Sequence, residues 1–98
     1  MNAAPWPPEG AVVRVVVIVN RKGLHARAAA AFAKTAGRYK AKVQVKRGEL
    51  TVSGISIMGL MMLAASPGTE IQIAAVGSDA EEAVAALETL VSLRFGED

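Results

Sequence analysis

Hydrophobic and polar positions follow two different periods along the chain, and these periods divide it into predicted strands and helices. Residues 11–19 are almost all apolar and β-branched, which favours a strand because such side chains lose rotamer freedom in a helix. Residues 42–46 and 70–76 alternate between apolar and polar, which gives each predicted strand one apolar face. A fourth, shorter strand is expected after a glycine turn, with Leu50 and Val52 facing inward.

Two segments have the period of a helix in the first two thirds of the chain. The first runs from Ala26 to about Arg38, and its apolar side chains recur every three or four positions on one face. The second, residues 56–66, is shorter. Ser56 stands where an N-cap residue accepts a hydrogen bond from the first turn of a helix.

The last segment is also predicted to be a helix, and its signals are the clearest in the chain. Ser78 and Glu81 have the spacing of a capping box, in which each side chain bonds to the backbone of the other residue. Apolar residues then recur at helical spacing as far as Val91, Arg94 continues the pattern, and Gly96 follows the predicted end.

The predicted order is therefore β-α-β-β-α-β-α, an α+β fold in one domain. Strands and helices with one apolar face each imply a two-layer sandwich, with a four-stranded sheet covered on one face by three helices. Three prolines within residues 1–10 indicate a flexible N-terminal leader, and we expect the folded domain to cover residues 11–98.

Composition narrows the class of protein. The chain of 98 residues is 52% hydrophobic but only 4% aromatic, so the core must be aliphatic. The formal net charge is +2 and the basic residues form no single run, which gives no sign of nucleic-acid binding. No apolar run approaches the roughly 20 residues of a membrane-spanning helix, and residues 1–10 do not resemble a signal peptide. The absence of cysteine fits the cytoplasm, where we expect the protein to work.

The single histidine, His25, lies where a glycine turn meets the first predicted helix. The first N–H groups of a helix have no partner within it and bind anions well. Arg27 adds a planar cation whose geometry suits phosphate oxygens. The same positive field disfavours an imidazolium, so we expect a neutral imidazole with a free lone pair, which can act as a nucleophile. Such surroundings would suit a transient phosphohistidine.

Other roles for His25 were weighed from the same residues. A lone histidine at a helix start is most often a surface residue or a substitute for a capping side chain, and Arg27 can be ordinary solvated charge. A metal site is not expected, because there is no second histidine, no cysteine and no carboxylate cluster around it. No cofactor is implied, and no catalytic triad can be placed.

Two motifs resemble one family closely. They are "GLHARAAAAFAK" (residues 23–34) and "SIMGLMMLA" (residues 56–64), and together they are similar to HPr, the histidine-containing phosphocarrier of the phosphoenolpyruvate-dependent phosphotransferase system. The resemblance covers roughly residues 11–95. The family fold, an open-faced sandwich of four antiparallel strands and three helices, agrees with the order predicted above.

The resemblance implies that His25 accepts a phosphoryl group on Nδ1 from phosphorylated enzyme I and passes it to an enzyme IIA protein. The guanidinium of Arg27 and the backbone N–H groups of Ala26 and Arg27 would hold the phosphate. The family commonly has proline at position 28 and asparagine at position 22, where this chain has Ala28 and Lys22. Alanine still favours a helix start, but a side-chain bond from position 22 to the imidazole becomes doubtful.

The second motif carries two further expectations. Ser56 matches the position that an HPr kinase/phosphorylase modifies in some lineages, although capping alone would explain a serine there. Its helix has more apolar residues than it can bury, and the resemblance implies that Ile57, Met58 and Met61 face partners, with Lys34 at the rim. The alanine-rich sequence is more similar to nitrogen-regulatory HPr proteins than to the sugar-transport type.

We therefore expect a monomeric phosphocarrier, not a stand-alone enzyme, that serves sugar uptake or, slightly favoured, nitrogen-related regulation. The main alternative is an HPr-like regulatory module that binds protein partners and acts mainly through its phosphorylation state. A nucleic-acid-binding module of β-α-β-β-α-β type would need aromatic residues on its strands, and the predicted strands have none. A stable subunit of some enzyme is a weaker alternative.

Overall fold

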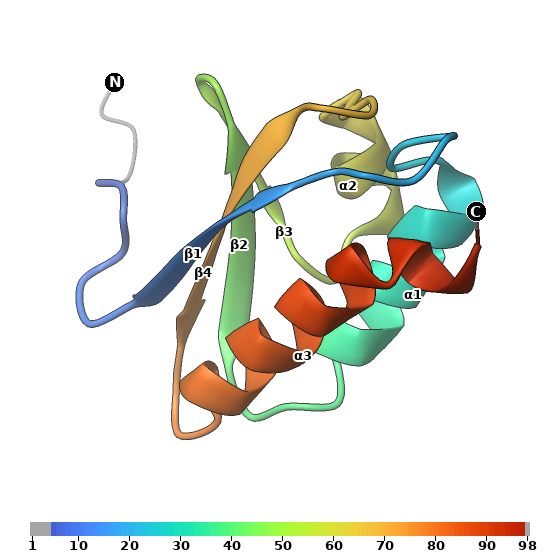
Figure 1. Ribbon diagram of the computed structural model, residues 1–98. Coiled ribbons are helices and arrows are strands. Elements are labelled where there is room, and N and C mark those ends of the chain that lie inside the picture. Colours follow the sequence, from blue (N-terminus) through green and yellow to red (C-terminus); the bar gives the residue numbers. More distant parts are fainter. Residues whose placement is uncertain (1–4, 98) are drawn as a thin grey trace.

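The sheet has four antiparallel strands in the order β1-β4-β2-β3. The structure is a computed structural model that describes residues 5–97. The strands are β1 (Val12–Val17), β2 (Lys42–Arg47), β3 (Leu50–Ser53) and β4 (Glu70–Val76). β4 lies between β1 and β2, so that the first and last strands of the chain are neighbours (Figure 1). The predicted fold class is confirmed.

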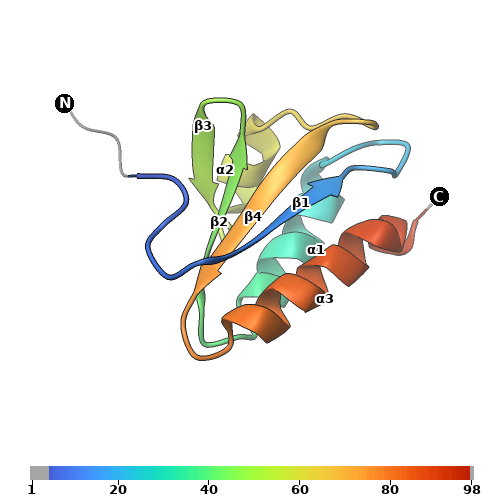
Figure 2. The ribbon, with the colours of Figure 1, turned by 60° about the vertical axis from the view of Figure 1, so that its left-hand side comes forward.

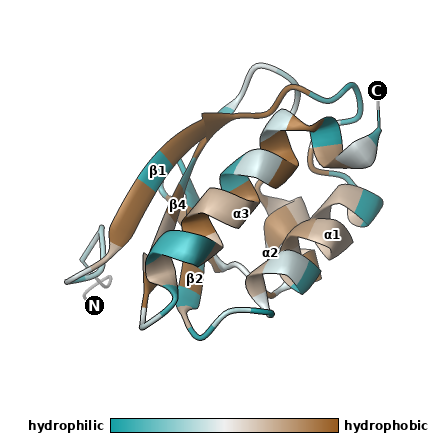
Figure 3. Ribbon diagram, turned by 60° about the horizontal axis from the view of Figure 1, so that its bottom comes forward, coloured by the Kyte–Doolittle hydropathy of each residue, from teal (hydrophilic) through white to brown (hydrophobic). Residues whose placement is uncertain are grey.

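Three helices cover one face of this sheet (Figure 2). They are α1 (Ala26–Ala36), α2 (Ile57–Met62) and α3 (Ala80–Ser92), and a short 3-10 turn, η1 (Arg94–Gly96), follows α3. Figure 3 shows the apolar sides of α1 and α3 turned toward each other and toward the sheet, with hydrophilic segments outside. The C-terminal end of the chain returns beside the start of α1 (Figure 1).

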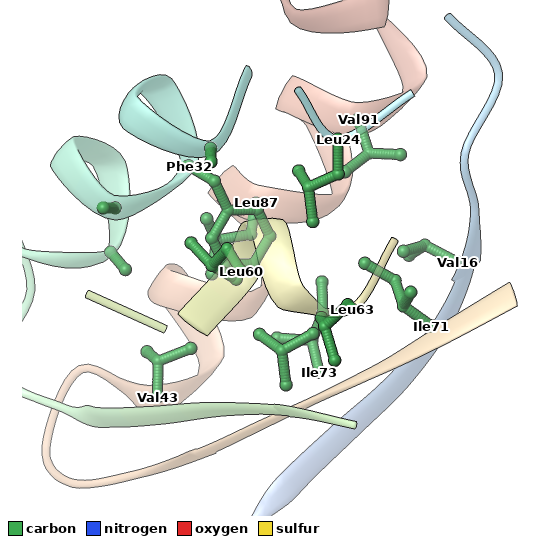
Figure 4. Packing of buried hydrophobic residues seen from close by; sticks show 14 of the residues in the cluster. Val16, Leu24, Phe32, Val43, Leu60, Leu63, Ile71, Ile73, Leu87 and Val91 are labelled. Atoms are coloured by element: carbon green, nitrogen blue, oxygen red, sulfur yellow. The ribbon is translucent and has the colours of Figure 1, made fainter. Parts of the chain in front are cut away.

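The core lies between the sheet and the helices and is aliphatic apart from one aromatic ring. The ring of Phe32 on α1 is fully buried, with Leu60 of α2 and Leu87 of α3 close by (Figure 4). Ile71 and Ile73 of β4 are fully buried beneath them. Helix α1 contributes several buried alanines, whose small side chains let a helix approach its neighbours closely. No helix among residues 5–97 is long and apolar enough to cross a membrane.

The expectation that Leu50 faces inward is wrong. Its side chain is 40% exposed, whereas Val52 is partly buried against the core. Leu50 is the first residue of β3, which is the edge strand of the sheet, and pairs with Arg47 beside the turn. The alternation is present, but the helices do not cover the sheet this far.

The predicted capping box at the start of α3 is also wrong. The N-cap residue is Asp79 instead of Ser78, and no side chain forms a cap hydrogen bond there. The Asp79 carboxylate accepts a hydrogen bond from the backbone N–H of Lys40 at 2.8 Å. This bond ties the β4–α3 turn to the loop before β2, so that a contact distant in sequence replaces the local one.

Helix α3 ends earlier than the pattern predicts. It stops at Ser92, and Arg94, Phe95 and Gly96 all have left-handed backbone, with φ of 59°, 56° and 77°. Phe95 is partly buried against the core. The turn that these residues form redirects the chain, and Glu97 becomes part of the domain instead of extending the helix.

Part of the predicted leader packs against the outer face of the sheet, away from the helices. The Trp6 indole N–H donates to Oε1 of Gln72 at 2.6 Å, and the Lys46 ammonium lies 5.9 Å from the centre of the indole ring. Gln72 and Lys46 are register partners on β4 and β2. Residues 1–4 of the predicted leader, and residue 98 of the predicted domain, lie outside the described residues.

The turn before α1 depends on Gly23. Its φ is 65°, and a Cβ at this position would lie 2.4 Å from the backbone oxygen of Ala65. The next residue, Leu24, donates its N–H to the same oxygen at 2.9 Å. The turn is therefore seated directly on the α2–β4 connection, and only glycine leaves room for this approach.

We predict that Gly23→Ala destabilises the protein more than Gly48→Ala does. Both glycines have similar positive φ, 65° and 59°, but nothing lies within 4 Å of a Cβ at position 48. Gly48→Ala should therefore cost about 1 kcal/mol of backbone strain. Gly23→Ala should cost about 1–3 kcal/mol more, because the Ala65 carbonyl must move. Urea unfolding of both variants measures the difference, and equal losses would show that the close approach does not matter.

Candidate functional site

His25 is the N-cap residue of α1, as the sequence predicted. Its backbone is extended (φ −76°, ψ −178°), and its carbonyl accepts the first helical hydrogen bond, from Ala29, at 2.8 Å. The imidazole does not cap the helix. The side chain is 26% exposed and therefore accessible at the surface.

The start of α1 remains open to a ligand. No side chain of the described residues forms a cap hydrogen bond to it, and the first N–H groups of a helix have no acceptor within the helix. Ala26 and Arg27 are both exposed, and Ala28 is fully buried. Alanine at position 28 therefore supports the helix start by packing, although the amide that a proline would lack is present.

A carboxylate from the far end of the chain reaches the imidazole. Nε2 of His25 lies 3.0 Å from both Oε1 and Oε2 of Glu97. The sequence analysis missed Glu97 because it follows the predicted helix end and lies 72 positions from the histidine. The available signal was Phe95, an apolar residue beyond the last helical turn, which together with Gly96 indicates a chain that turns back onto the domain.

Asn20 is a second residue that the sequence analysis missed. It is fully buried in the loop after β1, and its Nδ2 donates to the Gly23 carbonyl at 2.7 Å and to Oε1 of Glu97 at 2.9 Å. Lys22, which replaces the family's common asparagine, is exposed. In this chain an asparagine two positions earlier bonds to Glu97, and the carboxylate in turn bonds to the imidazole.

The charges around the imidazole have opposite signs. Arg21, Lys22 and Arg27 line an open depression together with Glu97. The expectation of a neutral imidazole considered only the helix and Arg27. Glu97 is an anion in direct contact with the ring and favours positive charge on it. The ring therefore lies between a cationic side that suits phosphate and an anionic side at Nε2.

The pKa of the Glu97 carboxyl is held below its usual range by hydrogen bonds from His25 and then Asn20, although desolvation opposes them. The charges of His25 and Arg27 act in the same direction as the hydrogen bonds. A group whose pKa is lowered by folding stabilises the folded chain above its unfolded pKa, and this stability is lost as the pH falls through its folded pKa. Glu97 is therefore ionised at neutral pH.

Ser56 caps α2, as predicted. Its Oγ accepts a hydrogen bond from the Gly59 N–H at 2.9 Å, and the residue is partly exposed. The other end of α2 is held by Arg47, whose Nη1 donates to the carbonyl oxygens of Leu63 and Ala64 at 2.8 and 3.0 Å. Ala64 lines the same shallow depression as His25, which places this end of the α2 segment next to the imidazole.

The predicted partner-facing residues are exposed. Ile57, Met58 and Met61 are 45%, 74% and 44% exposed, and Lys34 is exposed in the last turn of α1. Ile55 and Met62, which the sequence analysis did not select, are each 64% exposed and extend the same apolar surface. We call Ile55, Ile57, Met58, Met61 and Met62 the α2 patch. Among the residues that the structure describes, no cluster of His, Cys, Asp or Glu could hold a metal ion.

Comparisons with known proteins agree with this geometry. A family model described as "PTS HPr component phosphorylation site" matches residues 12–92. The "Phosphocarrier protein HPr" of Neisseria meningitidis is 48% identical over 82 residues, which are 84% of this chain and 92% of the relative. The "Phosphocarrier protein NPr" of Shewanella violacea is 39% identical over 84 residues, 86% of this chain and 92% of the relative.

A solved structure is also similar. The crystal structure of HPr from Thermoanaerobacter tengcongensis superposes with a TM-score of 0.85 and is 39% identical in sequence. The match covers 89% of this chain and 98% of that one. The similarity thus extends over nearly the whole of both molecules.

We predict that His25→Ala raises the pKa of the Glu97 carboxyl toward its usual range. The substitution removes the hydrogen bond that contributes most to the lowered pKa. The side-chain carboxyl carbon of Glu97, followed by NMR through an acid titration, gives this pKa directly. The control is Lys42→Ala, on an exposed residue at the start of β2, which should leave the titration of Glu97 unchanged. An unchanged pKa in His25→Ala would show that the contact does not exist in solution.

Proposed function

The chain belongs to the HPr family of phosphocarrier proteins of the phosphotransferase system, and from this premise we propose that His25 carries a phosphoryl group from phosphorylated enzyme I to an enzyme IIA protein. As a phosphocarrier it is not a stand-alone enzyme. The observation that carries the proposal is the position of the only histidine, at the uncapped start of α1 beside Arg27. This is where a helix binds an anion best.

In the proposed transfer, the Nδ1 lone pair of His25 forms the bond to phosphorus. The bond between phosphorus and the donor's leaving atom breaks, and its electron pair stays with the donor. The phosphoryl oxygens are received by the backbone N–H groups of Ala26 and Arg27 and by the Arg27 guanidinium. These donors are in place before the phosphate arrives, so little reorganisation is needed. Transfer to the acceptor is the same step in reverse, with a new nucleophile.

The surface around the site supports exchange between several partners. A carrier has to dock with its donor and its acceptor through one face, and flexible methionine side chains adapt to differently shaped surfaces. We assign this role to Ile57, Met58 and Met61 of the α2 patch, with Lys34 attracting acidic groups at the rim. The patch is exposed in a single chain, and we propose that the carrier works as a monomer in the cytoplasm.

Ser56 is the proposed regulatory position, to be modified by an HPr kinase/phosphorylase. A phosphate on Oγ would lie at the start of α2, next to the N–H of Gly59, where a negative charge is stabilised. The same charge would stand beside the α2 patch and would repel acidic partner surfaces. Modification of Ser56 is therefore expected to weaken docking without unfolding the helix.

The recipient distinguishes sugar uptake from nitrogen-related regulation. The alanine-rich sequence slightly favours the nitrogen branch, and the relatives that match carry both the HPr and the NPr name. Incubation of the phosphorylated chain with enzyme IIA proteins of both branches would identify the recipient. Failure to transfer to any of them would favour the alternative, a regulatory module that acts through its phosphorylation state.

We predict that phosphoenolpyruvate, Mg²⁺ and a cognate enzyme I place one acid-labile phosphoryl group on this chain. His25→Ala should abolish the labelling, because the nucleophile is gone, while the circular dichroism spectrum stays unchanged. Arg27→Ala serves as the control, since it keeps the nucleophile and should be labelled more slowly, by about tenfold or more. Labelling that persists in His25→Ala would reject the assignment.

We also predict that Ser56→Asp accepts phosphate from enzyme I more slowly than the wild type. Aspartate caps a helix about as well as serine does, so the stability of α2 should change little while the charge remains. The uncharged comparison is Ser56→Asn, which is also a good N-cap residue and should be phosphorylated at the wild-type rate. Equal rates for Ser56→Asp and Ser56→Asn would leave Ser56 with its capping role alone.

A further inference from the structure

We propose that Glu97 is a positioning residue that holds the ring proton of His25 on Nε2 and so makes Nδ1 the phosphoryl acceptor. This inference deepens the proposed function and rests on it. It assigns a role to the C-terminal segment, which neither of the two sequence motifs includes.

The geometry leaves one arrangement of the proton. Both carboxylate oxygens of Glu97 lie 3.0 Å from Nε2, and an ionised carboxylate can only accept hydrogen bonds. Nε2 must therefore carry a proton. In the neutral imidazole the lone pair is then on Nδ1, the other ring nitrogen. A hydrogen bond at one nitrogen commonly fixes the reactivity of the other in this way.

Glu97 is itself held from two sides. Oε1 accepts a hydrogen bond from Nδ2 of Asn20, a fully buried residue whose other amide proton is bound to the Gly23 carbonyl. On its own chain, the left-handed turn of η1 directs Glu97 toward the site, and the partly buried Phe95 anchors that turn. The carboxylate is therefore positioned by buried contacts, although its own side chain is 21% exposed.

The same contact matches the charge that the reaction creates. When Nδ1 bonds to phosphorus, the proton on Nε2 stays, and the ring gains positive charge that faces Glu97. When the phosphoryl group leaves, the ring departs as neutral imidazole, a far better leaving group than an imidazole anion. Arg27, Arg21 and Lys22 face Glu97 across the depression and keep its charge from repelling the incoming phosphate. Glu97 thus assists both acceptance and donation.

The test compares Glu97→Gln with Glu49→Gln, a matched change in the exposed β2–β3 turn. A glutamine amide can either accept from Nε2 or donate to it, so the ring should no longer be held in one form. The readout is the ¹⁵N spectrum of the ring nitrogens at pH 8, which is unambiguous because the chain has one histidine. We expect one tautomer, protonated on Nε2, in the wild type and in Glu49→Gln, and a mixture in Glu97→Gln.

Phosphorylation by enzyme I should slow about tenfold in Glu97→Gln and stay unchanged in Glu49→Gln, a loss typical of a partner that orients a reactive histidine. An unchanged tautomer and an unchanged rate in Glu97→Gln would each overturn the proposal. The tautomer is measured without phosphate. If the wild type accepts no phosphoryl group, the proposed function fails, but the spectrum still decides whether Glu97 holds the proton.

Discussion

The hydrogen bond from the Leu24 N–H to the Ala65 carbonyl, 2.9 Å long, is the contact on which the geometry of the site depends. It joins the turn before α1 to the connection between α2 and β4, two segments about forty residues apart. Because Gly23 approaches the same carbonyl too closely for any side chain, this junction fixes where α1 begins. The N-cap position of His25 then follows, as does the direction in which the first amides of the helix point. The phosphate-binding end of α1 is thus placed by tertiary packing instead of by a local cap.

Most of the fold follows from local patterns. The strands alternate or are β-branched, and the helices have the expected apolar stripe, so their periods alone predict the order of elements. Errors occurred where a distant contact replaces a local one. Asp79 binds the Lys40 N–H, which displaces the capping box predicted for Ser78. Leu50 lies on the edge strand beyond the cover of the helices, and the period cannot show where that cover ends.

The candidate site divides in the same way. His25, Arg27 and the helix start are neighbours in sequence, so the motif shows them together. Glu97 and Asn20 are 77 positions apart, and only the fold brings them into contact. The position of Glu97 also requires a left-handed turn at Arg94 and Phe95, a conformation that neither residue type favours, so no local propensity predicts it. Such turns persist when the surrounding packing holds them, and here Phe95 provides that packing against the core.

The opposite charges on the two sides of the imidazole suit a carrier better than a permanent binding site. A site made only of cations and amides would hold a phosphorylated ring too firmly for ready release. A site made only of carboxylates would repel the phosphate. With Arg27 and the helix amides on one side and Glu97 on the other, the phosphoryl group is received while the ring keeps the proton that makes it a good leaving group. This balance predicts that substitutions on the two sides affect different steps. Loss of Arg27 weakens the hold on the phosphate itself, whereas loss of Glu97 acts on the ring and therefore slows acceptance and donation together.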